Sequence, residues 1–243
     1  MKKKTNISII GTRGYPYVYS GYETFVKELS ERLVVKDCNV TIYCHKGLFD
    51  EKPKEIKGIK LVYIPTIETK VFSQPIHSFL SIIHACFSNI DVLLVVNSSN
   101  GPFGLITKIF NIPTAINVDG LEWLRPKWKG IGSVYFKWAS KMATLFYDQI
   151  INDSEEMRRV YLELFNKDSK VIAYGANIRK SKNPNLINTW NIKPREYYLI
   201  VGRLIPDNNA DLIIKGFLKS NSNKKLVVVG DVPYDDLYAS KIK

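Results

Sequence analysis

Short apolar runs alternate along this chain with longer segments of helical period, and this alternation limits the possible fold more than any other feature. Several runs are apolar at nearly every position, as in Val92–Val96, which is typical of strands in a parallel sheet covered on both faces. The segment Tyr22–Leu33 carries its apolar residues on one stripe, and Asp153 followed by Glu156 predicts a capped helix. The alternation therefore predicts a doubly wound α/β domain over residues 1–178. The runs that we interpret as its strands are Asn6–Ile10, Val40–Cys44, Ile59–Ile64, Val92–Asn97, Thr114–Val118, Gln149–Asn152 and Lys170–Ala173.

The pattern changes after this domain. Residues 179–194 are rich in Lys, Ser, Asn and Pro, which is typical of a linker. A strand at Tyr197–Val201, a helix at Ala210–Leu218 and a strand at Leu226–Val229 then form one βαβ unit. Two parallel strands and one helix do not make a self-sufficient sheet domain. We therefore interpret residues 195–243 as the incomplete start of a second Rossmann-like domain.

Charge and cysteine usage restrict the function classes. The 243 residues contain 35 Lys and Arg against 23 Asp and Glu, a net charge of +12 that favours an anionic partner. Nucleic acid, an anionic membrane surface and phosphorylated small molecules all satisfy this, but no nucleic-acid-binding module is recognisable. The three cysteines are widely spaced without a CxxC pair, which argues against a metal or disulfide framework and favours a cytoplasmic location. No stretch approaches the roughly 18 apolar residues of a membrane span.

A glycine-rich loop follows the first predicted strand directly and precedes the first helix. It contains Gly11, Arg13, Gly14 and Gly21. Glycines let a backbone approach a ligand closely, and the following helix offers free N–H groups, so the loop suits a phosphate or sugar hydroxyls. The GxxG spacing is not a dinucleotide fingerprint. The alternative is a plain tight turn between strand and helix.

Two further sites lie at predicted strand ends. Asp119 and Glu122 follow the strand Thr114–Val118, where ligands of open α/β sheets bind, and we interpret them as catalytic-site residues. The alternative is an Asx-type turn with a solvated glutamate. Gly202 and Arg203 follow the strand of the second unit, and an arginine there suits a diphosphate.

The segment 121–142 combines basic and aromatic residues, the composition of a surface that sits on an anionic membrane. The predicted membrane contacts are Lys127, Trp128, Lys129 and Lys137. The alternative is a helical core stripe with solvated lysines. That stripe would consist of Tyr135, Trp138, Ala139, Met142 and Phe146.

These motifs together resemble the GT-B glycosyltransferases of the large retaining group called family 4, in particular its rhamnosyltransferase-like branch. The strings that carry the resemblance are GTRGYPYVYSGYETFVKELSERL, INVDGLEW, NDSEEMRRVY, YGANI and VGRLIPDNNADLIIKGF. The resemblance implies two Rossmann-like domains that hold a nucleotide-sugar between them. It places the glycine loop on the cleft floor and Arg203 at the diphosphate leaving group. Asp119 stands where many relatives carry a histidine that contacts the donor sugar, which implies a positioning role.

The chain departs from that family at two places. Most relatives pair the arginine with a lysine five residues on, where this chain has Asn208, as does the rhamnosyltransferase-like branch. The family's downstream glutamate motif, which grips ribose and donor sugar, is missing, so we expect a C-terminal domain cut short.

The expected activity is therefore hexosyl transfer, with rhamnose as the sugar that the branch suggests. The donor would be a nucleotide-sugar, and the acceptor a lipid-linked glycan of a bacterial surface polysaccharide on the inner face of the cell membrane. Neither a metal nor another cofactor is expected. The alternative is a catalytically inactive, glycosyltransferase-like binding partner.

Overall fold

The computed structural model describes residues 3–16, 20–67, 69, 72–118, 120–125, 128–178, 180–232 and 237–242. The chain divides into two compact units. The first contains Met1–Leu124 and Gly130–Gly175, and the second contains Arg125–Lys129 and Ala176–Lys243. The segment predicted as a linker lies in the second unit, where η4 (Pro184–Trp190) forms a 3-10 helix.

The first unit is built on an eight-stranded sheet of order β3-β4-β2-β1-β5-β6-β7-β8. Its central strand β1 pairs in parallel with β2 on one side and β5 on the other, and the remaining ladders are parallel except that of β3 with β4. The predicted doubly wound sheet is confirmed, whereas the short antiparallel β3 was not predicted. The strands are β1 (Asn6–Ile10), β2 (Asn39–His45), β3 (Glu55–Ile56), β4 (Ile59–Ile64), β5 (Val92–Val96), β6 (Thr114–Val118), β7 (Gln149–Asn152) and β8 (Lys170–Val171).

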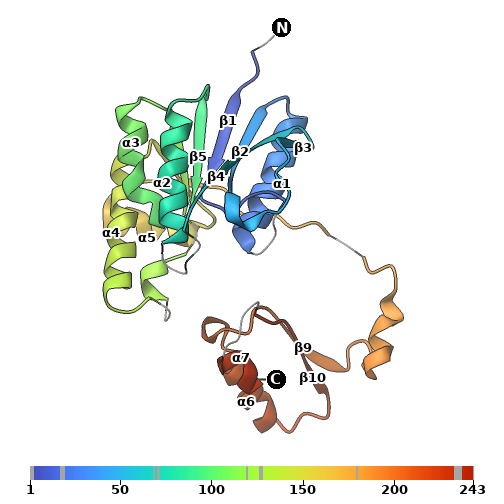
Figure 1. The fold of residues 1–243 in the computed structure, drawn as a ribbon. Coiled ribbons are helices and arrows are strands. Elements are labelled where there is room, and N and C mark those ends of the chain that lie inside the picture. Colours follow the sequence, from blue (N-terminus) through green and yellow to red (C-terminus); the bar gives the residue numbers. More distant parts are fainter. Residues whose placement is uncertain are drawn as a thin grey trace. The chain divides into compact units, whose positions relative to one another are not determined.

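Helices cover the sheet on both faces, as its continuous apolar strands require. Figure 1 shows α2 (Ser73–Cys86), α3 (Gly104–Ile109) and α4 (Ile131–Phe146) packed together on one side, with α1 (Gly21–Val35) on the other. The helix α5 (Glu155–Phe165) joins β7 to β8. Short 3-10 helices follow three strands at their carboxyl ends. They are η1 (Lys46–Leu48), η2 (Ser98–Phe103) and η3 (Glu122–Leu124).

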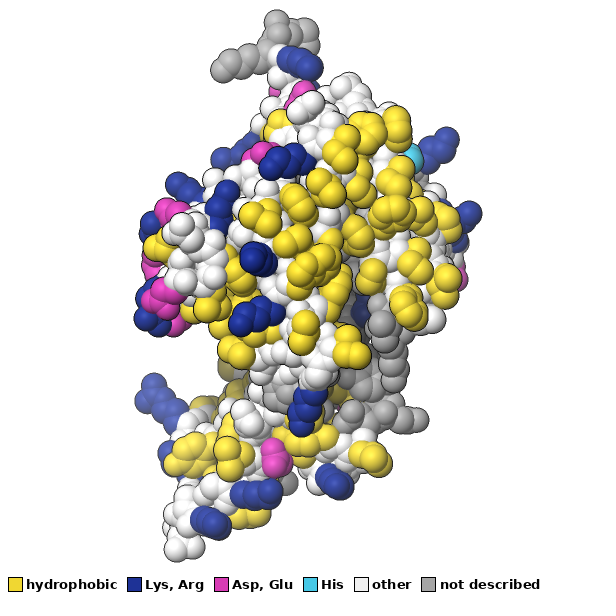
Figure 2. Space-filling view, turned by 90° about the vertical axis from the view of Figure 1, so that its left-hand side faces the viewer, with side chains coloured by type: hydrophobic (Ala, Val, Ile, Leu, Met, Phe, Trp, Pro, Cys, Tyr) yellow, Lys and Arg dark blue, Asp and Glu magenta, His cyan; other side chains and the backbone are white. Residues whose placement is uncertain are grey.

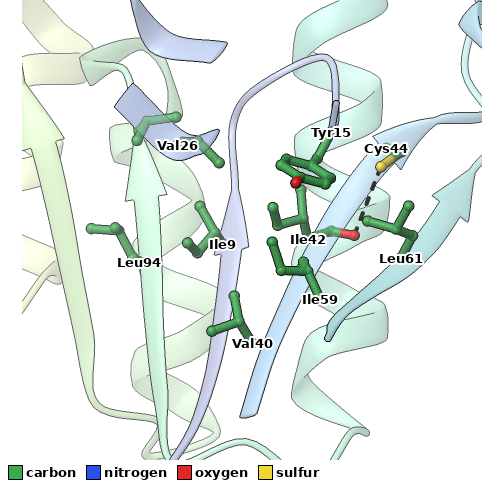
Figure 3. Packing of buried hydrophobic residues seen from close by; sticks show 10 residues of the cluster. Ile9, Tyr15, Val26, Val40, Ile42, Cys44, Ile59, Leu61 and Leu94 are labelled. Atoms are coloured by element: carbon green, nitrogen blue, oxygen red, sulfur yellow. Dashed lines mark hydrogen bonds between the residues drawn. The ribbon is translucent and has the colours of Figure 1, made fainter. Parts of the chain in front are cut away.

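The core under α1 includes a residue of the glycine loop. Ile9, Ile42 and Ile59 from adjacent strands are fully buried there, and Val26 of α1 packs onto them (Figure 3). Tyr15, which follows Gly14 in the glycine loop, is inserted into the same cluster. The loop is therefore anchored in the core directly after its second glycine.

Two helix assignments need correction. The helix α5 begins at Glu155 with Ser154 as its N-cap, because the Ser154 hydroxyl accepts the Met157 N–H at 3.4 Å; Asp153 lies one residue too early. The core stripe that the alternative interpretation assigns to α4 is confirmed only in part, because Ala139 is buried whereas Trp138 is 47% exposed. The residues of α4 that are buried are Phe136, Ala139, Ser140, Ala143 and Thr144.

The second unit has a two-stranded parallel sheet of β9 (Tyr197–Val201) and β10 (Lys225–Val229). The 3-10 helix η5 (Pro206–Asn208) and the helices α6 (Ala210–Lys219) and α7 (Leu237–Ile242) complete it. Its small core centres on Leu204, Ala210 and Ala239. Within this unit the Arg125 guanidinium donates to Asp207 Oδ2 at 2.8 Å. None of the helices described in either unit has the length and apolar character needed to cross a bilayer.

Candidate functional site

The carboxyl ends of the central parallel strands bring several loops to one edge of the first unit. In the sheet, β1 lies between β2 and β5, so the chain leaves β1 in one direction and returns to its other side later. This reversal of strand order is where open α/β sheets bind ligands. The loop 11–16 leaves β1 there, next to the end of β2 at His45 and the turn 97–100 after β5.

Two of the predicted glycines have no room for a side chain. Gly11 has φ +106°, and a Cβ there would lie 2.3 Å from the Val96 carbonyl oxygen of the neighbouring strand. Gly14 has φ +131°, and its Cβ would lie 2.8 Å from Cys44 Sγ. Both positive φ values favour glycine independently of the space. Gly21 differs, because it begins α1 and a Cβ there would meet nothing within 4 Å.

Glu23 of α1 organises this loop, a role that our sequence analysis missed. Its side chain is buried, and one carboxylate oxygen accepts the Arg13 N–H at 3.3 Å while the other accepts the Ser20 N–H at 3.0 Å. Ser20 and Glu23 form a capping box at the start of α1. The spacing Ser-x-x-Glu before an apolar stripe is the signal that could have identified it.

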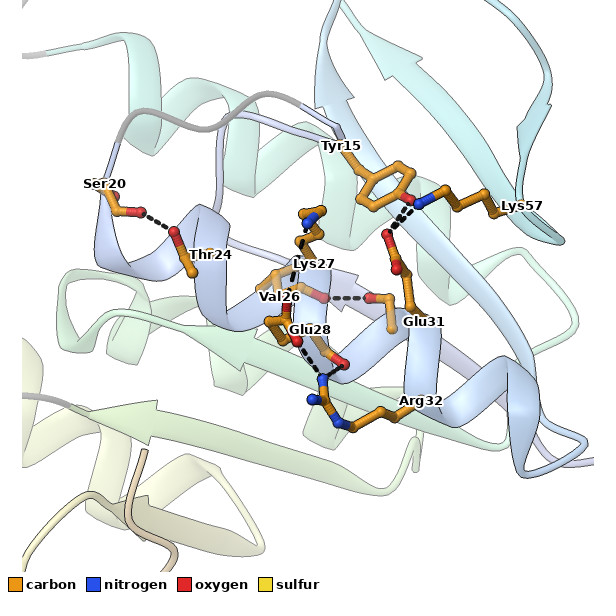
Figure 4. Close-up of polar contacts among 10 residues, drawn as sticks. Tyr15, Ser20, Thr24, Val26, Lys27, Glu28, Glu31, Arg32 and Lys57 are labelled. Carbon is orange, nitrogen blue, oxygen red and sulfur yellow. Dashed lines mark hydrogen bonds and ion pairs between the residues drawn. The ribbon is translucent and has the colours of Figure 1, made fainter. Parts of the chain in front are cut away.

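The main chain of Arg13 is fixed on both sides, because its carbonyl accepts the His45 N–H at 3.0 Å. Two residues later, the Tyr15 hydroxyl donates to Glu31 at 2.7 Å, and Lys57 contacts the same carboxylate (Figure 4). The hydrogen bond from Tyr15, followed by Lys57, lowers the pKa of Glu31, while burial and then Glu31 raise the pKa of Tyr15. Glu31 is thus an ionised anchor for the loop and not a proton donor.

Buried polar atoms line the boundary between β1 and β5. Thr12 Oγ1 and Asn100 Oδ1 are buried without a hydrogen-bond partner among the described residues. The other side of the Asn100 amide donates to the Val96 carbonyl at 2.8 Å, next to Gly11. Native proteins rarely leave such atoms unsatisfied, so these two are consistent with a polar ligand at this edge.

Two stacked histidines, His45 of β2 and His77 of α2, lie at the carboxyl end of the neighbouring strand β2. The rings of His45 and His77 stack with centroids 3.9 Å apart, and both side chains are fully buried. Burial, and then the neighbouring His45, lowers the pKa of His77 to about 3. His77 is therefore neutral near pH 7 and unsuited to bind a phosphate as a cation.

The end of β6 holds the other predicted pair. Asp119 lies outside the described residues, whereas Glu122 is buried at the start of η3. Nearby, Asn117 Oδ1 accepts the Tyr174 hydroxyl at 2.8 Å. Glu122 is thus not the solvated surface charge of the alternative interpretation.

In the second unit, Gly202 and Arg203 follow β9 as predicted. The Arg203 side chain is exposed. Asn208 donates its amide to the Arg203 carbonyl at 2.7 Å, so it stabilises this turn. A Cβ at Gly230 would lie 1.8 Å from the Gly202 oxygen, which shows how closely the loops after β9 and β10 approach.

The four predicted membrane contacts belong to both units of the chain. Lys137 is exposed on α4 in the first unit. Trp128 and Lys129 belong to the second unit, and Lys127 lies outside the described residues. Within the described part of the chain, no three His, Cys, Asp or Glu side chains are grouped so that they could hold a metal ion.

Comparison with solved structures identifies the architecture as GT-B. HepE from Anabaena, in complex with UDP and glucose, matches over 99% of this chain with a TM-score of 0.69 and 13% identity. The catalytic domain of starch synthase IV from Arabidopsis thaliana, bound to ADP and acarbose, matches over 96% with a TM-score of 0.66 and 12% identity. The chain spans 65% of the HepE chain and 69% of the starch synthase chain. These identities show the fold alone.

Sequence comparison adds the family. Among curated proteins, none matches the chain. One family model, described as "Domain of unknown function (DUF1972)", matches residues 4–177 and so covers most of the chain, including the whole loop after β1. The chain therefore belongs to the DUF1972 family.

Proposed function

We propose that this protein is a glycosyltransferase. It would move a hexosyl group from a nucleotide-sugar to an acceptor that is bound at the carboxyl end of β1 in the first unit. The observation that carries the proposal is the loop after β1. Gly11 and Gly14 are required there by space, and buried polar atoms of Thr12 and Asn100 lack partners beside it. That combination, on a GT-B fold, suits a sugar hydroxyl or phosphate better than a plain turn.

The proposed chemistry uses fixed dipoles and cations in place of a metal. Sugar transfer requires a diphosphate to leave while positive charge develops at the anomeric carbon. The N-terminus of α1, which Ser20 and Glu23 cap, lies beside Arg13 and adds the positive end of the helix dipole. Arg203 is the cation that we assign to the diphosphate, with Gly202 beside it. Asp119 and Glu122 are proposed to position donor or acceptor at the end of β6.

The finer assignment rests on the resemblance described above. In this assignment the protein is a retaining family 4 enzyme of the rhamnosyltransferase-like branch. It acts in the cytoplasm and extends a lipid-linked bacterial surface polysaccharide. Asn208 supports the branch only by its identity, because the rhamnosyltransferase-like sequences also carry an asparagine at this position. Since the chain spans 65% of HepE, the activity is proposed for the whole protein.

Nucleotide binding to the 243-residue chain tests the donor site. We expect Arg203→Ala to weaken binding of a nucleoside diphosphate by about tenfold to a hundredfold, as loss of a charged hydrogen bond does. Lys219→Ala, an exposed change in the same unit, should leave affinity unchanged. Titration calorimetry with UDP and dTDP measures both. Equal affinity of Arg203→Ala and the parent chain would contradict the donor assignment.

Arg13→Ala tests the first unit. Its main-chain bonds to Glu23 and His45 survive the substitution, so we expect the melting temperature to stay nearly constant. Sugar transfer by the whole protein should fall strongly, whereas Lys36→Ala should leave it unchanged. A large thermal shift with normal transfer would make Arg13 a structural residue. Donor binding without transfer by the parent whole protein would favour the inactive binding partner.

A further inference from the structure

Three helices of the first unit carry apolar residues on their outward sides. The exposed positions include Phe79 of α2 at 40%, Ile109 of α3 at 69% and Ile131 of α4 at 90% exposure. Val134 of α4 is 70% exposed. Figure 2 shows the hydrophobic side chains gathered over this side of the molecule, with scattered lysines among them. We call this surface the α2–α4 face. Its large apolar members are Phe79, Leu80, Phe87, Leu105, Ile109, Phe110, Ile131, Val134, Trp138 and Leu145.

Contacts between the helices make the α2–α4 face continuous. The rings of Phe79 and Phe103 lie 5.9 Å apart, which joins α2 to η2. Those of Phe87 and Phe110, at the ends of α2 and α3, lie 5.3 Å apart. Lys108 of α3 donates to the carbonyl of Leu145 in α4 at 3.2 Å. A contiguous exposed apolar surface of this kind marks an interaction site.

Other helices of the same unit show what a solvated surface looks like in this protein. On α1, Glu28 pairs with Arg32, and on α5 Glu156 pairs with Arg159. The helices α2, α3 and α4 contain no Asp or Glu at all. Their outward surface is therefore specialised, because the chain uses ion pairs freely elsewhere.

The charges on the α2–α4 face select the partner. Lys108, Lys137 and Lys141 are exposed on it, and the three helices offer no carboxylate to balance them. A second copy of the same face would bring lysines against lysines. Phenylalanine and tryptophan among lysines instead match an anionic lipid surface, with the rings at the headgroup level and the ammonium groups near the phosphates.

We propose that the α2–α4 face docks this protein on an anionic bilayer. Of the predicted membrane contacts, Lys137 lies on this face, while the contribution of α2 and α3 was not predicted. The inference extends the proposed function, since a lipid-linked acceptor would be met from such a surface. Vesicle binding can be measured without a sugar donor, and donor binding without vesicles. The experiments can therefore contradict membrane docking and the proposed glycosyltransferase function independently of each other.

The test is flotation of the full chain with vesicles of phosphatidylcholine, alone or mixed with phosphatidylglycerol. We expect binding to the mixed vesicles that weakens with salt, because screening shortens electrostatic reach to about 8 Å at physiological ionic strength. Lys137→Glu combined with Lys141→Glu should reduce it by about tenfold or more. The control, Lys54→Glu with Lys60→Glu, makes the same change in net charge on exposed residues elsewhere and should retain binding.

A second pair of variants tests the apolar part. Ile109→Ser with Val134→Ser should weaken flotation, whereas Val35→Ser with Leu164→Ser, exposed on α1 and α5, should not. Circular dichroism confirms folding of each variant. Equal binding to neutral vesicles, or equal losses in the face and control variants, would overturn the proposal. So would conversion of a lipid-free dimer to a monomer by the face variants, which would identify a second copy as the partner.

Discussion

Gly11 and Gly21 sit at opposite ends of the same loop but bear different constraints. Gly11→Ala places a Cβ 2.3 Å from a strand carbonyl at φ +106°, and the backbone of β5 cannot move aside easily. We expect it to reduce the free energy of unfolding by about 2 kcal/mol or more. Gly21→Ala places a Cβ in open space on a helix and should be neutral or stabilising by up to about 1 kcal/mol. Urea denaturation compares the two, and equal effects would contradict the steric argument.

His77 is the residue whose burial makes stability depend on pH. Its pKa falls from 6.5 to about 3 on folding, so the unfolded chain binds more protons between these values. Stability should therefore decrease as pH falls below 6.5, by about 1.4 kcal/mol per unit from this residue. We expect His77→Gln to flatten the dependence between about pH 7 and about pH 5, measured by urea unfolding. His84→Gln, exposed on the same helix, is the control, and a slope unchanged in His77→Gln would refute the prediction.

At the scale of the element, the junction of β1 with α1 depends on one carboxylate. The two carboxylate oxygens of Glu23 accept the Arg13 and Ser20 N–H groups. Glu23→Gln keeps the size of the side chain but removes its charge and replaces one of these oxygens with an NH2 group, which cannot accept a hydrogen bond. We expect faster amide exchange at these two residues and a loss of about 1–3 kcal/mol. Glu28→Gln removes a surface ion pair with Arg32 and should lose less than about 1 kcal/mol. Amide hydrogen exchange at Arg13 and Ser20 can be measured by NMR. Equal exchange rates in Glu23→Gln and Glu28→Gln would contradict the proposal that Glu23 holds this junction together.

Strand positions could be predicted from the sequence because buried parallel strands are apolar throughout. The bounds of β1, β4 and β9 agree with the structure. The helix α4 resisted the same reasoning, because its exposed side is as apolar as its buried side and periodicity cannot distinguish them. The glycines predicted the loop site, but nothing in the sequence pointed to Thr12 and Asn100. Whether a buried polar atom finds a hydrogen-bond partner depends on tertiary packing, which the sequence pattern does not show.

At the scale of the whole molecule, the two units differ in how completely they cover their strands. In the first unit, Ile9 and Val95 at the sheet centre are fully buried. In the second, Leu199, Val201 and Val229 of the two-stranded sheet are 52%, 69% and 51% exposed. Exposed apolar strands of a small sheet pair readily with other chains. The 243-residue chain should therefore self-associate through its second unit.

Charges on those strands should prevent this association. Because Leu199 and Val201 are exposed, replacing both with glutamate leaves the small core at Leu204 intact while like charges oppose strand pairing. We expect size-exclusion chromatography with light scattering to show the parent chain as oligomers at micromolar concentration and Leu199→Glu with Val201→Glu as a monomer. Ile109→Ser with Val134→Ser should leave the oligomers in place, since the α2–α4 face serves lipid and not a second copy. A parent chain that is monodisperse and monomeric would contradict this prediction, because the exposed sheet would then be soluble on its own.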